Sequence, residues 1–315
     1  MVTRPTLFIF RKVRSRRPLL SACDPGASNF RSSEGIRVKR LVVAAVVGAA
    51  VLLVPAAPAV AKADPVKALK ARFATGKGVK VSNLTKVSTG GEVWATLREV
   101  GSVGFGRSGV AATDIQDKAQ YSKAFLDALP EAEREELQAT LGLTRTISTS
   151  KYAYISGARV KNYLPEGKTW VRRFSGAPVP GSLLVNPFEP RTLDKIIDRA
   201  GSRQGSVLKG WISSSSLAKI SPSFRASFGS GKTSDGKASK VNYTVWLDAR
   251  GLVKRVYATM TMHIVDTPLT YATDGRVSGW GGKVVISAPP AGEVIDEGQL
   301  ADGALDDPSP VELGF

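Results

Sequence analysis

Regular alternation of apolar and polar side chains over residues 241–264 is the sequence feature that most restricts the possible folds of this chain. Side chains two positions apart point to the same face of a strand, so the alternation predicts strands and not helices. Ala249–Gly251 interrupts the pattern as a turn would, and the alternation then resumes. We therefore expect an antiparallel hairpin with one apolar face. That face comprises Val241, Tyr243, Val245, Leu247, Val256, Ala258, Met260, Met262 and Ile264.

The rest of the chain from residue 64 onward shows short helical patterns between strand-like runs. Long antiparallel strands with few helices indicate an α+β fold, in which the helices lie on one face of a curved sheet. The expected strands are residues 79–88, 92–105, 151–157, 168–175, 206–212 and 267–281, and the expected helices are residues 64–74, 117–142 with a break at Pro130, 191–202 with an end at Gly201, and 214–220.

Residues 38–63 have the layout of a signal peptide. Two basic residues precede an apolar run, and Ala61-Lys62-Ala63 places small residues at the positions that a signal peptidase recognises. We expect cleavage after Ala63, or after Ala61; the first leaves Asp64 as the start of a secreted, extracytoplasmic chain. The alternative is a retained membrane anchor over residues 41–60, but two prolines within this run disfavour a continuous helix.

Residues 1–37, which precede this signal, are basic and lack sustained periodicity. We expect translation to start at Val38, since a valine can be read from a GTG start codon, so that residues 1–37 are not part of the protein; otherwise they form a disordered extension. Residues 20–23 match the acylation box of bacterial lipoproteins, but basic residues interrupt the apolar run that such a box needs. Because Cys23 is the only cysteine, residues 64–315 hold no disulfide, no zinc–thiolate site and no acylated cysteine.

The net charge differs between the whole sequence and the parts of it that follow the signal. The whole sequence carries a formal net charge of +17, residues 64–315 carry +8, and residues 64–292 carry +15. The basic residues are scattered singly, so we do not expect a nucleic-acid partner; an anionic membrane surface or an envelope polyanion fits better. Residues 298–315 are acidic, contain Gly and Pro and are aperiodic, which predicts a disordered tail.

No motif in the sequence supports catalysis. Residues 104–109 match a dinucleotide fingerprint, but no second βαβ unit follows, and residues 226–233 match a phosphate loop that leads into a polar loop and not into a helix. The only histidine, His263, lies within a predicted strand. We therefore expect no enzymatic activity, no cofactor and no metal site.

Several segments, in this order, resemble a known family. They are residues 162–172 (NYLPEGKTWVR), the helix 191–201, and residues 205–222 (GSVLKGWISSSSLAKISP), 241–256 (VNYTVWLDARGLVKRV) and 279–296 (GWGGKVVISAPPAGEVID). Over residues 64–297 the chain resembles the LolA-like superfamily, in particular the actinobacterial secreted proteins and lipoproteins related to LppX and LprG. The resemblance implies a half-open antiparallel barrel with helices on its concave face, and a carrier of lipids or lipoproteins. The missing acylated cysteine implies a released protein.

These observations together predict an exported, monomeric, non-enzymatic carrier or binding protein for a lipid or another hydrophobic ligand. The alternative is an envelope-associated binding or sensor module that transports no lipid. Flexible methionines suit a cavity for variable chains, although the same side chains also suit an ordinary packed core. Trp246 and His263, one position out of phase, are expected to face the opposite side of the sheet. The predicted cavity residues are Val245, Leu247, Val256, Met260 and Met262.

Overall fold

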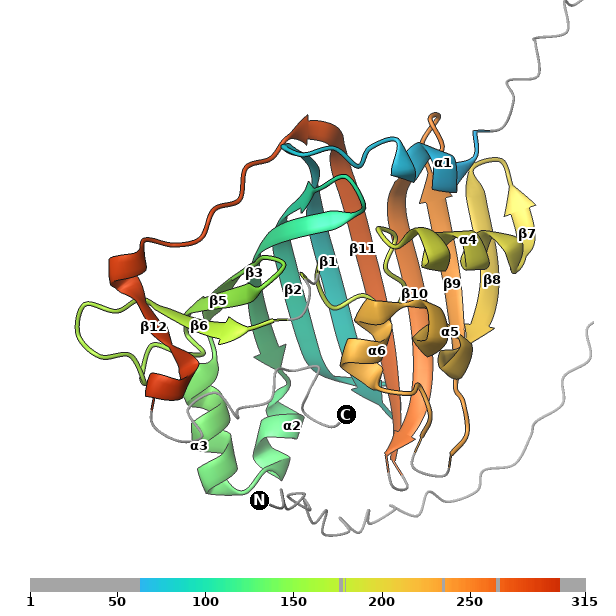
Figure 1. Cartoon of the computed structure of the whole chain (residues 1–315). Coiled ribbons are helices and arrows are strands. Elements are labelled where there is room, and N and C mark those ends of the chain that lie inside the picture. Colours follow the sequence, from blue (N-terminus) through green and yellow to red (C-terminus); the bar gives the residue numbers. More distant parts are fainter. Residues whose placement is uncertain (1–62, 176–177, 179, 234–235, 265–266, 301–315) are drawn as a thin grey trace, which may run out of the picture. The chain divides into compact units, whose positions relative to one another are not determined.

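One long sheet organises the part of the chain that the structure describes (Figure 1). The structure is a computed structural model, and it describes residues 63–300 except 176–177, 179, 234–235 and 265–266. The predictions for residues 1–37, for the signal or anchor before Ala63, and for the tail beyond Leu300 lie outside the described residues. The strands are β1 (Lys77–Thr89), β2 (Glu92–Phe105), β3 (Val110–Tyr121), β4 (Leu143–Ser148), β5 (Tyr152–Gly157), β6 (Trp170–Phe174), β7 (Ala200–Gln204), β8 (Val207–Ser213), β9 (Lys240–Leu247), β10 (Val253–Ile264), β11 (Thr267–Lys283) and β12 (Val294–Asp296).

The described strands form two meanders that share one seam. Their order is β12-β6-β5-β4-β3-β2-β1-β11-β10-β9-β8-β7, so β1 to β6 run in one direction from the seam and β11 to β7 run in the other. Neighbouring strands are antiparallel except for β12, which pairs in parallel with β6. The sheet is curved and does not close, because β12 and β7 form its two edges (Figure 1).

The helices are short, and three of them cover half of the sheet. Figure 1 shows α4, α5 and α6 in front of β8 to β11, α1 at one end of the sheet, and α2 and α3 towards the other end. No helix in the described part of the chain is both long and apolar enough to cross a bilayer. The helices are α1 (Pro65–Lys70), α2 (Lys123–Ala128), α3 (Glu131–Thr140), α4 (Pro190–Asp198), α5 (Ser214–Ile220) and α6 (Pro222–Phe228).

The main core lies between these helices and the face of the sheet that they cover, here called the inner face. The predicted alternation in β9 and β10 is confirmed, since Val245 and Val256 are directly paired and both are buried. They pack in one apolar cluster with Leu193 of α4, Leu217 of α5 and residues of β11. A second apolar cluster, which includes Val79, Val103 and Phe188, packs on the inner face at β1, β2 and β3.

The sequence-based assignment of residues 117–142 is wrong in its first part. Residues 117–121 belong to β3, which pairs with β2 as far as Tyr121 opposite Ala95. The helix begins after Ser122, whose hydroxyl accepts a hydrogen bond from the Phe125 N–H at 3.1 Å. The predicted break at Pro130 is confirmed, because α2 ends before it and α3 begins after it.

The expected helix end at Gly201 is also wrong. The helix α4 ends at Asp198, and Gly201 belongs to the edge strand β7. The strands β3, β4, β7 and β12 and the helix α6 were not expected. All of them except β3 are short, and none of the short ones carries a pattern long enough to show a helical or strand period.

Candidate ligand-binding site

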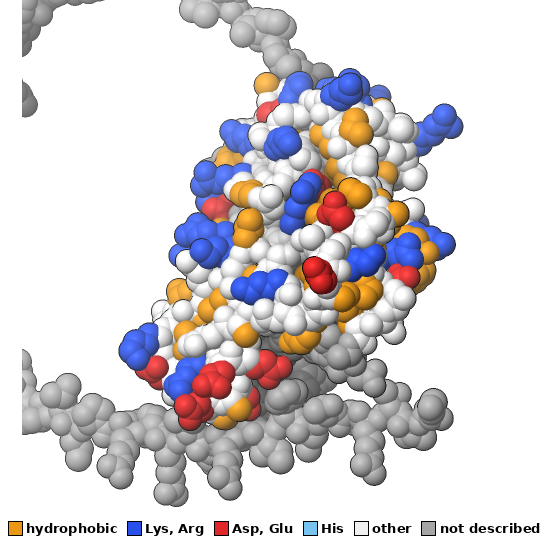
Figure 2. Space-filling view, turned by 90° about the vertical axis from the view of Figure 1, so that its left-hand side faces the viewer, with side chains coloured by type: hydrophobic (Ala, Val, Ile, Leu, Met, Phe, Trp, Pro, Cys, Tyr) orange, Lys and Arg blue, Asp and Glu red, His pale blue; other side chains and the backbone are white. Residues whose placement is uncertain are grey.

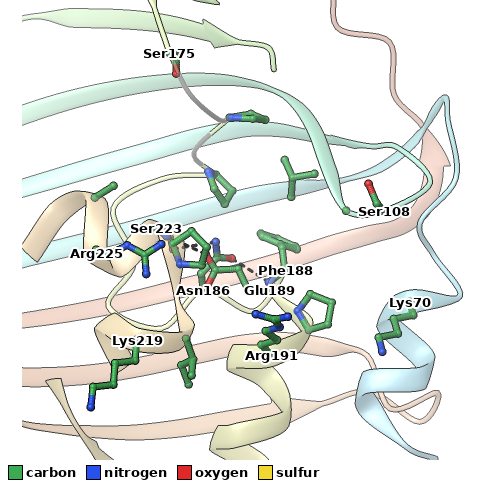
Figure 3. A pocket seen from close by; sticks show the side chains of 18 residues that line it. Lys70, Ser108, Ser175, Asn186, Phe188, Glu189, Arg191, Lys219, Ser223 and Arg225 are labelled. Carbon is green, nitrogen blue, oxygen red and sulfur yellow. Dashed lines mark hydrogen bonds between the residues drawn. The ribbon is translucent and has the colours of Figure 1, made fainter. Parts of the chain in front are cut away.

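A hollow of about 980 Å³ lies on the inner side of the sheet, where the first turns of α4 and α6 approach the β2–β3 turn (Figure 3). The end of α1 and the segment after β6 complete its wall. The surface of its wall is mainly apolar, although the lining side chains divide into eight apolar and nine polar or charged ones. Those apolar residues are Val110, Pro178, Pro180, Phe188, Pro190, Ile220, Pro222 and Ala226, beside Gly109.

Rigid apolar groups form much of this wall. Phe188 is buried, and its ring centroid lies 6.1 Å from that of Phe105 and 5.8 Å from that of Trp280. Four of the lining residues are prolines, which have fixed backbone φ angles and no N–H donors. The hollow therefore offers hydrocarbon surface with few backbone groups that need a hydrogen-bond partner.

Polar contacts fix the two helix starts against each other. One oxygen of Glu189 accepts from the Ser223 N–H at 3.0 Å, and the other accepts from the Thr192 hydroxyl at 2.7 Å. Asn186 accepts from the Phe188 N–H at 2.9 Å and donates to the Ser223 hydroxyl at 3.2 Å. The carboxylate of Glu189 is thus occupied in joining α4 to α6.

Basic side chains border the hollow. Lys70, Arg191, Lys219 and Arg225 line it, against the single carboxylate of Glu189. Arg225 donates to the Ala218 carbonyl at 3.0 Å, but none of the four basic groups forms an ion pair with an acid in the described part of the chain. Figure 3 shows Arg225, Arg191 and Lys70 on one side, with Ser108 and Ser175 across from them. The border therefore attracts anions.

A segment that we call the strap, residues 180–188, crosses the inner face beside the hollow and is held by a buried carboxylate. Glu99 of β2 accepts from the Ser182 N–H at 3.0 Å and from the Asn83 amide at 3.2 Å. Asp117 of β3 lies directly opposite Glu99 in the sheet and pairs with Arg159 at 3.5 Å. Burial raises the pKa of both carboxyls, although these hydrogen bonds lower that of Glu99 and Arg159 lowers that of Asp117.

The predicted cavity residues lie in the main core and not in this hollow. Val245, Leu247, Val256 and Met260 are buried in the cluster beneath the helices, and Met262 packs half-buried against it. None of them lines the hollow described above. Their role as a ligand cavity thus stays a prediction.

The two residues expected on the opposite side differ in exposure. Trp246 is half-buried, and the Arg255 guanidinium lies 4.7 Å from its ring centroid; His263 is exposed. His263 does not line the hollow. The expected cleavage position is described on its Asp64 side, where the carboxylate caps α1 by accepting from the Val66 N–H at 2.9 Å.

Sequence reasoning missed the residues that do line the hollow. Two signals were available, because a proline stands in the first turn of both helices, at Pro190 and Pro222. These signals locate two helix starts. They do not show that the starts face each other across the inner face of a sheet, since that depends on long-range pairing.

The chemistry of the hollow favours binding. Its polar side chains are hydroxyls, one amide, one bound carboxylate and four cations. The glycine motif of residues 104–109 forms the end of β2 and the turn into β3, and residues 226–233 run from α6 into a loop. Within the described ranges, no three His, Cys, Asp or Glu side chains are grouped so that they could hold a metal ion.

Comparison with known proteins gives weak likenesses only. No protein-family model and no curated protein matches the chain. A porin-like protein from Bacteroides uniformis aligns at a TM-score of 0.25 and 8% identity, over 65% of this chain and 99% of that one. A LolA superfamily protein from Nitrosomonas europaea aligns at 0.24 and 8%, over 70% and 93%. Lipovitellin aligns at 0.22 and 8%, over 70% and 27%. At these TM-scores the chain is assigned to none of them.

Proposed function

We propose that this chain binds and carries an amphipathic molecule, with its hydrocarbon part in the hollow and an anionic group against the basic border. One observation carries the proposal: a hollow of about 980 Å³ combines mostly apolar walls with four basic side chains and one occupied carboxylate. Its volume lies at the upper end of the range of about 300–1,000 Å³ that small-molecule sites occupy. Apolar walls with a few placed polar groups are typical of such sites.

We further propose that α4 to α6 occupy the concave face of a LolA-like sheet, that the protein is a non-enzymatic monomer, and that residues 38–63 direct it out of the cytoplasm. The sequence patterns support the export signal and the LolA-like sheet, and the packing of α4, α5 and α6 in one apolar cluster with the sheet supports the placement of the helices. The second candidate function is an envelope binding or sensor module that carries no lipid. The exposed cations around the hollow would suit this function if their ligand is an anion without a hydrocarbon chain.

Extraction of the purified full-length protein with organic solvent, followed by mass spectrometry, tests the proposal first. We expect a co-purified acidic amphiphile. A fluorescent long-chain fatty acid and its methyl ester then report on binding directly. The acid is expected to bind more tightly than the ester, because only the acid carries a charge for the basic border.

A matched pair of variants localises the binding. Ala226 lines the hollow from the exposed side of α6, so Ala226→Trp fills it with little effect on folding. Ala132 is exposed on α3 and does not line the hollow, so Ala132→Trp is the control. We expect the first variant to abolish uptake of the fatty acid and the second to retain it. Equal binding by both variants contradicts a site in the hollow, and binding of inorganic anions alone favours the second candidate.

A further inference from the structure

The outer face of the sheet, opposite the strap and the helices, carries an uneven distribution of charge. Residues that are directly paired lie on the same face, and on β8, β9, β10, β11, β1, β2 and β3 the pairing runs from Lys209 through Thr244, Tyr257, Asp274 and Leu84 to Arg98 and Lys118. Adjacent rows add further basic groups. We call this surface the basic face, and its exposed members are Lys86, Arg98, Lys118, Lys209, Lys240 and Arg276.

The acids on this face are already paired. The two carboxylate oxygens of Asp274 each accept a hydrogen bond of 2.7 Å from the Arg255 guanidinium. The Arg276 guanidinium lies 3.9 Å from the same carboxylate. Asp114, towards β4, accepts two hydrogen bonds of 2.8 Å from Arg145. The exposed lysines form no ion pair with a described acid. The basic face therefore presents net positive charge, and Figure 2 shows Lys and Arg side chains along its left-hand border, where this face is seen edge-on.

Large apolar groups stand among these charges. Trp211 is 52% exposed, Val100 is 51% exposed and Tyr257 is 38% exposed. The Lys240 ammonium lies 5.1 Å from the centroid of Trp211, so a cation and an indole ring point outward together. Exposed Trp and Tyr on one face, next to lysines with long aliphatic stems, suit a boundary between hydrocarbon and water.

We propose that the basic face docks on the surface of an anionic lipid bilayer. Each lysine or arginine near such a surface adds to the attraction, and Trp211 and Tyr257 reach the level of the headgroups. A soluble polyanion satisfies the charges but leaves these aromatic groups exposed to water, which is why a bilayer fits this face better. The inference does not depend on what occupies the hollow, because hollow and basic face lie on opposite sides of the sheet.

Vesicle sedimentation with the chain from Asp64 onward, which lacks the apolar run of residues 41–60, tests this docking. We expect binding to vesicles of phosphatidylcholine with about one third phosphatidylglycerol and little binding to phosphatidylcholine alone, with a loss of binding as salt is added. The variant Lys86→Glu/Arg98→Glu/Lys118→Glu should bind about a hundredfold more weakly. The control Lys67→Glu/Lys161→Glu/Arg199→Glu makes the same change in net charge on α1, a turn and the end of α4, and should bind as the wild type does. Circular dichroism checks that both variants fold.

A second measurement separates the bilayer from a soluble polyanion. Trp211→Ala should weaken vesicle binding and remove part of the shift of tryptophan emission to shorter wavelength that we expect on docking, while affinity for polyphosphate stays unchanged. The proposal is overturned if both triple variants lose binding equally, or if phosphatidylcholine binds as well as the anionic vesicles. It is also overturned if Trp211→Ala binds vesicles as the wild type does, which assigns the basic face to a soluble polyanion.

Discussion

At the scale of single residues, Met260 decides whether the main core has room for a ligand. It is 2% exposed and packs among Val256, Leu217 and Tyr271 in the cluster beneath the helices. If this cluster is packed as tightly as other protein interiors, Met260→Trp should lower the free energy of unfolding by about 1–3 kcal/mol. Urea unfolding measures the change. The control Thr261→Trp adds the same ring at an exposed position and should change stability by less than about 0.5 kcal/mol. No loss for Met260→Trp would show free volume, as the ligand-cavity hypothesis requires.

The buried carboxyl of Glu99 should make stability depend on pH. Burial raises its pKa, so between its unfolded and folded pKa values the native state binds more protons than the unfolded state. The contribution is therefore fully present below the unfolded pKa and is lost as the pH rises through the folded pKa. Asp117, which faces Glu99 and contacts Arg159, shifts in the same direction.

Unfolding measured between pH 5 and pH 8 checks this sign. We expect the free energy of unfolding of the wild type to fall with rising pH more steeply than that of Glu99→Gln, whose side chain does not ionise. Comparison with the variant removes the effect of groups that shift the other way, such as Asp248, whose pKa is lowered by hydrogen bonds from Leu252 and Arg250 despite partial burial. Identical slopes would contradict a proton-linked role for Glu99.

At the scale of elements, the strap depends on one glycine. Gly181 has a φ of +112°, and a Cβ added there would lie 2.3 Å from the Asn83 amide nitrogen and 2.8 Å from a Glu99 oxygen. Gly181→Ala should therefore destabilise by about 1–3 kcal/mol, through backbone strain and loss of these contacts. Gly167 also has a positive φ, of +76°, but a Cβ there meets nothing within 4 Å. Gly167→Ala isolates the backbone term, and an equal loss in both variants would show that the strap contacts contribute nothing.

Some of these elements could be predicted from the sequence and others could not. The hairpin of β9 and β10, the break at Pro130 and the strands β1 and β2 follow from local alternation or from proline geometry, which the sequence carries directly. Residues 117–121 were expected to be helical together with the real helices that follow them; their strand conformation comes from pairing with β2. The hollow could not be predicted for a related reason. Its walls come from five separate segments, and only the tertiary fold brings Pro190 and Pro222 together.

At the scale of the whole molecule, the C-terminal end covers an edge of the sheet. Asp296 of β12 accepts hydrogen bonds of 2.6 and 2.8 Å from Arg172 of β6, and Leu300 packs against the small cluster of Ile155, Val160 and Val171. The first residues of the predicted tail, up to Leu300, are thus in contact with the sheet. An uncovered β6 would present unpaired backbone groups.

Two truncations test this contact. Ending the chain after Pro290 removes β12 and Leu300, and we expect the melting temperature to fall by at least about 5 °C, the effect of a loss of about 2 kcal/mol in a domain of this size. Light scattering should show self-association through β6. Ending the chain after Leu300 keeps β12, so it should leave both quantities nearly unchanged. Similar melting temperatures for the two truncations would show that β12 contributes little.

The seam between β1 and β11 also sets the order in which this chain can fold. Ser88 donates to the carbonyl of Thr270, which lies 182 positions further along the sequence, at 3.4 Å. The centre of the sheet thus joins the first strand to one of the last. Loop closure over such distances makes folding slow. A chain that is still being synthesised contains β1 but not yet β11, its partner at the seam. Such a chain stays unpaired at its centre until synthesis is nearly finished. If residues 38–63 direct export as proposed, this delay keeps the polypeptide threadable through a narrow channel before the sheet forms.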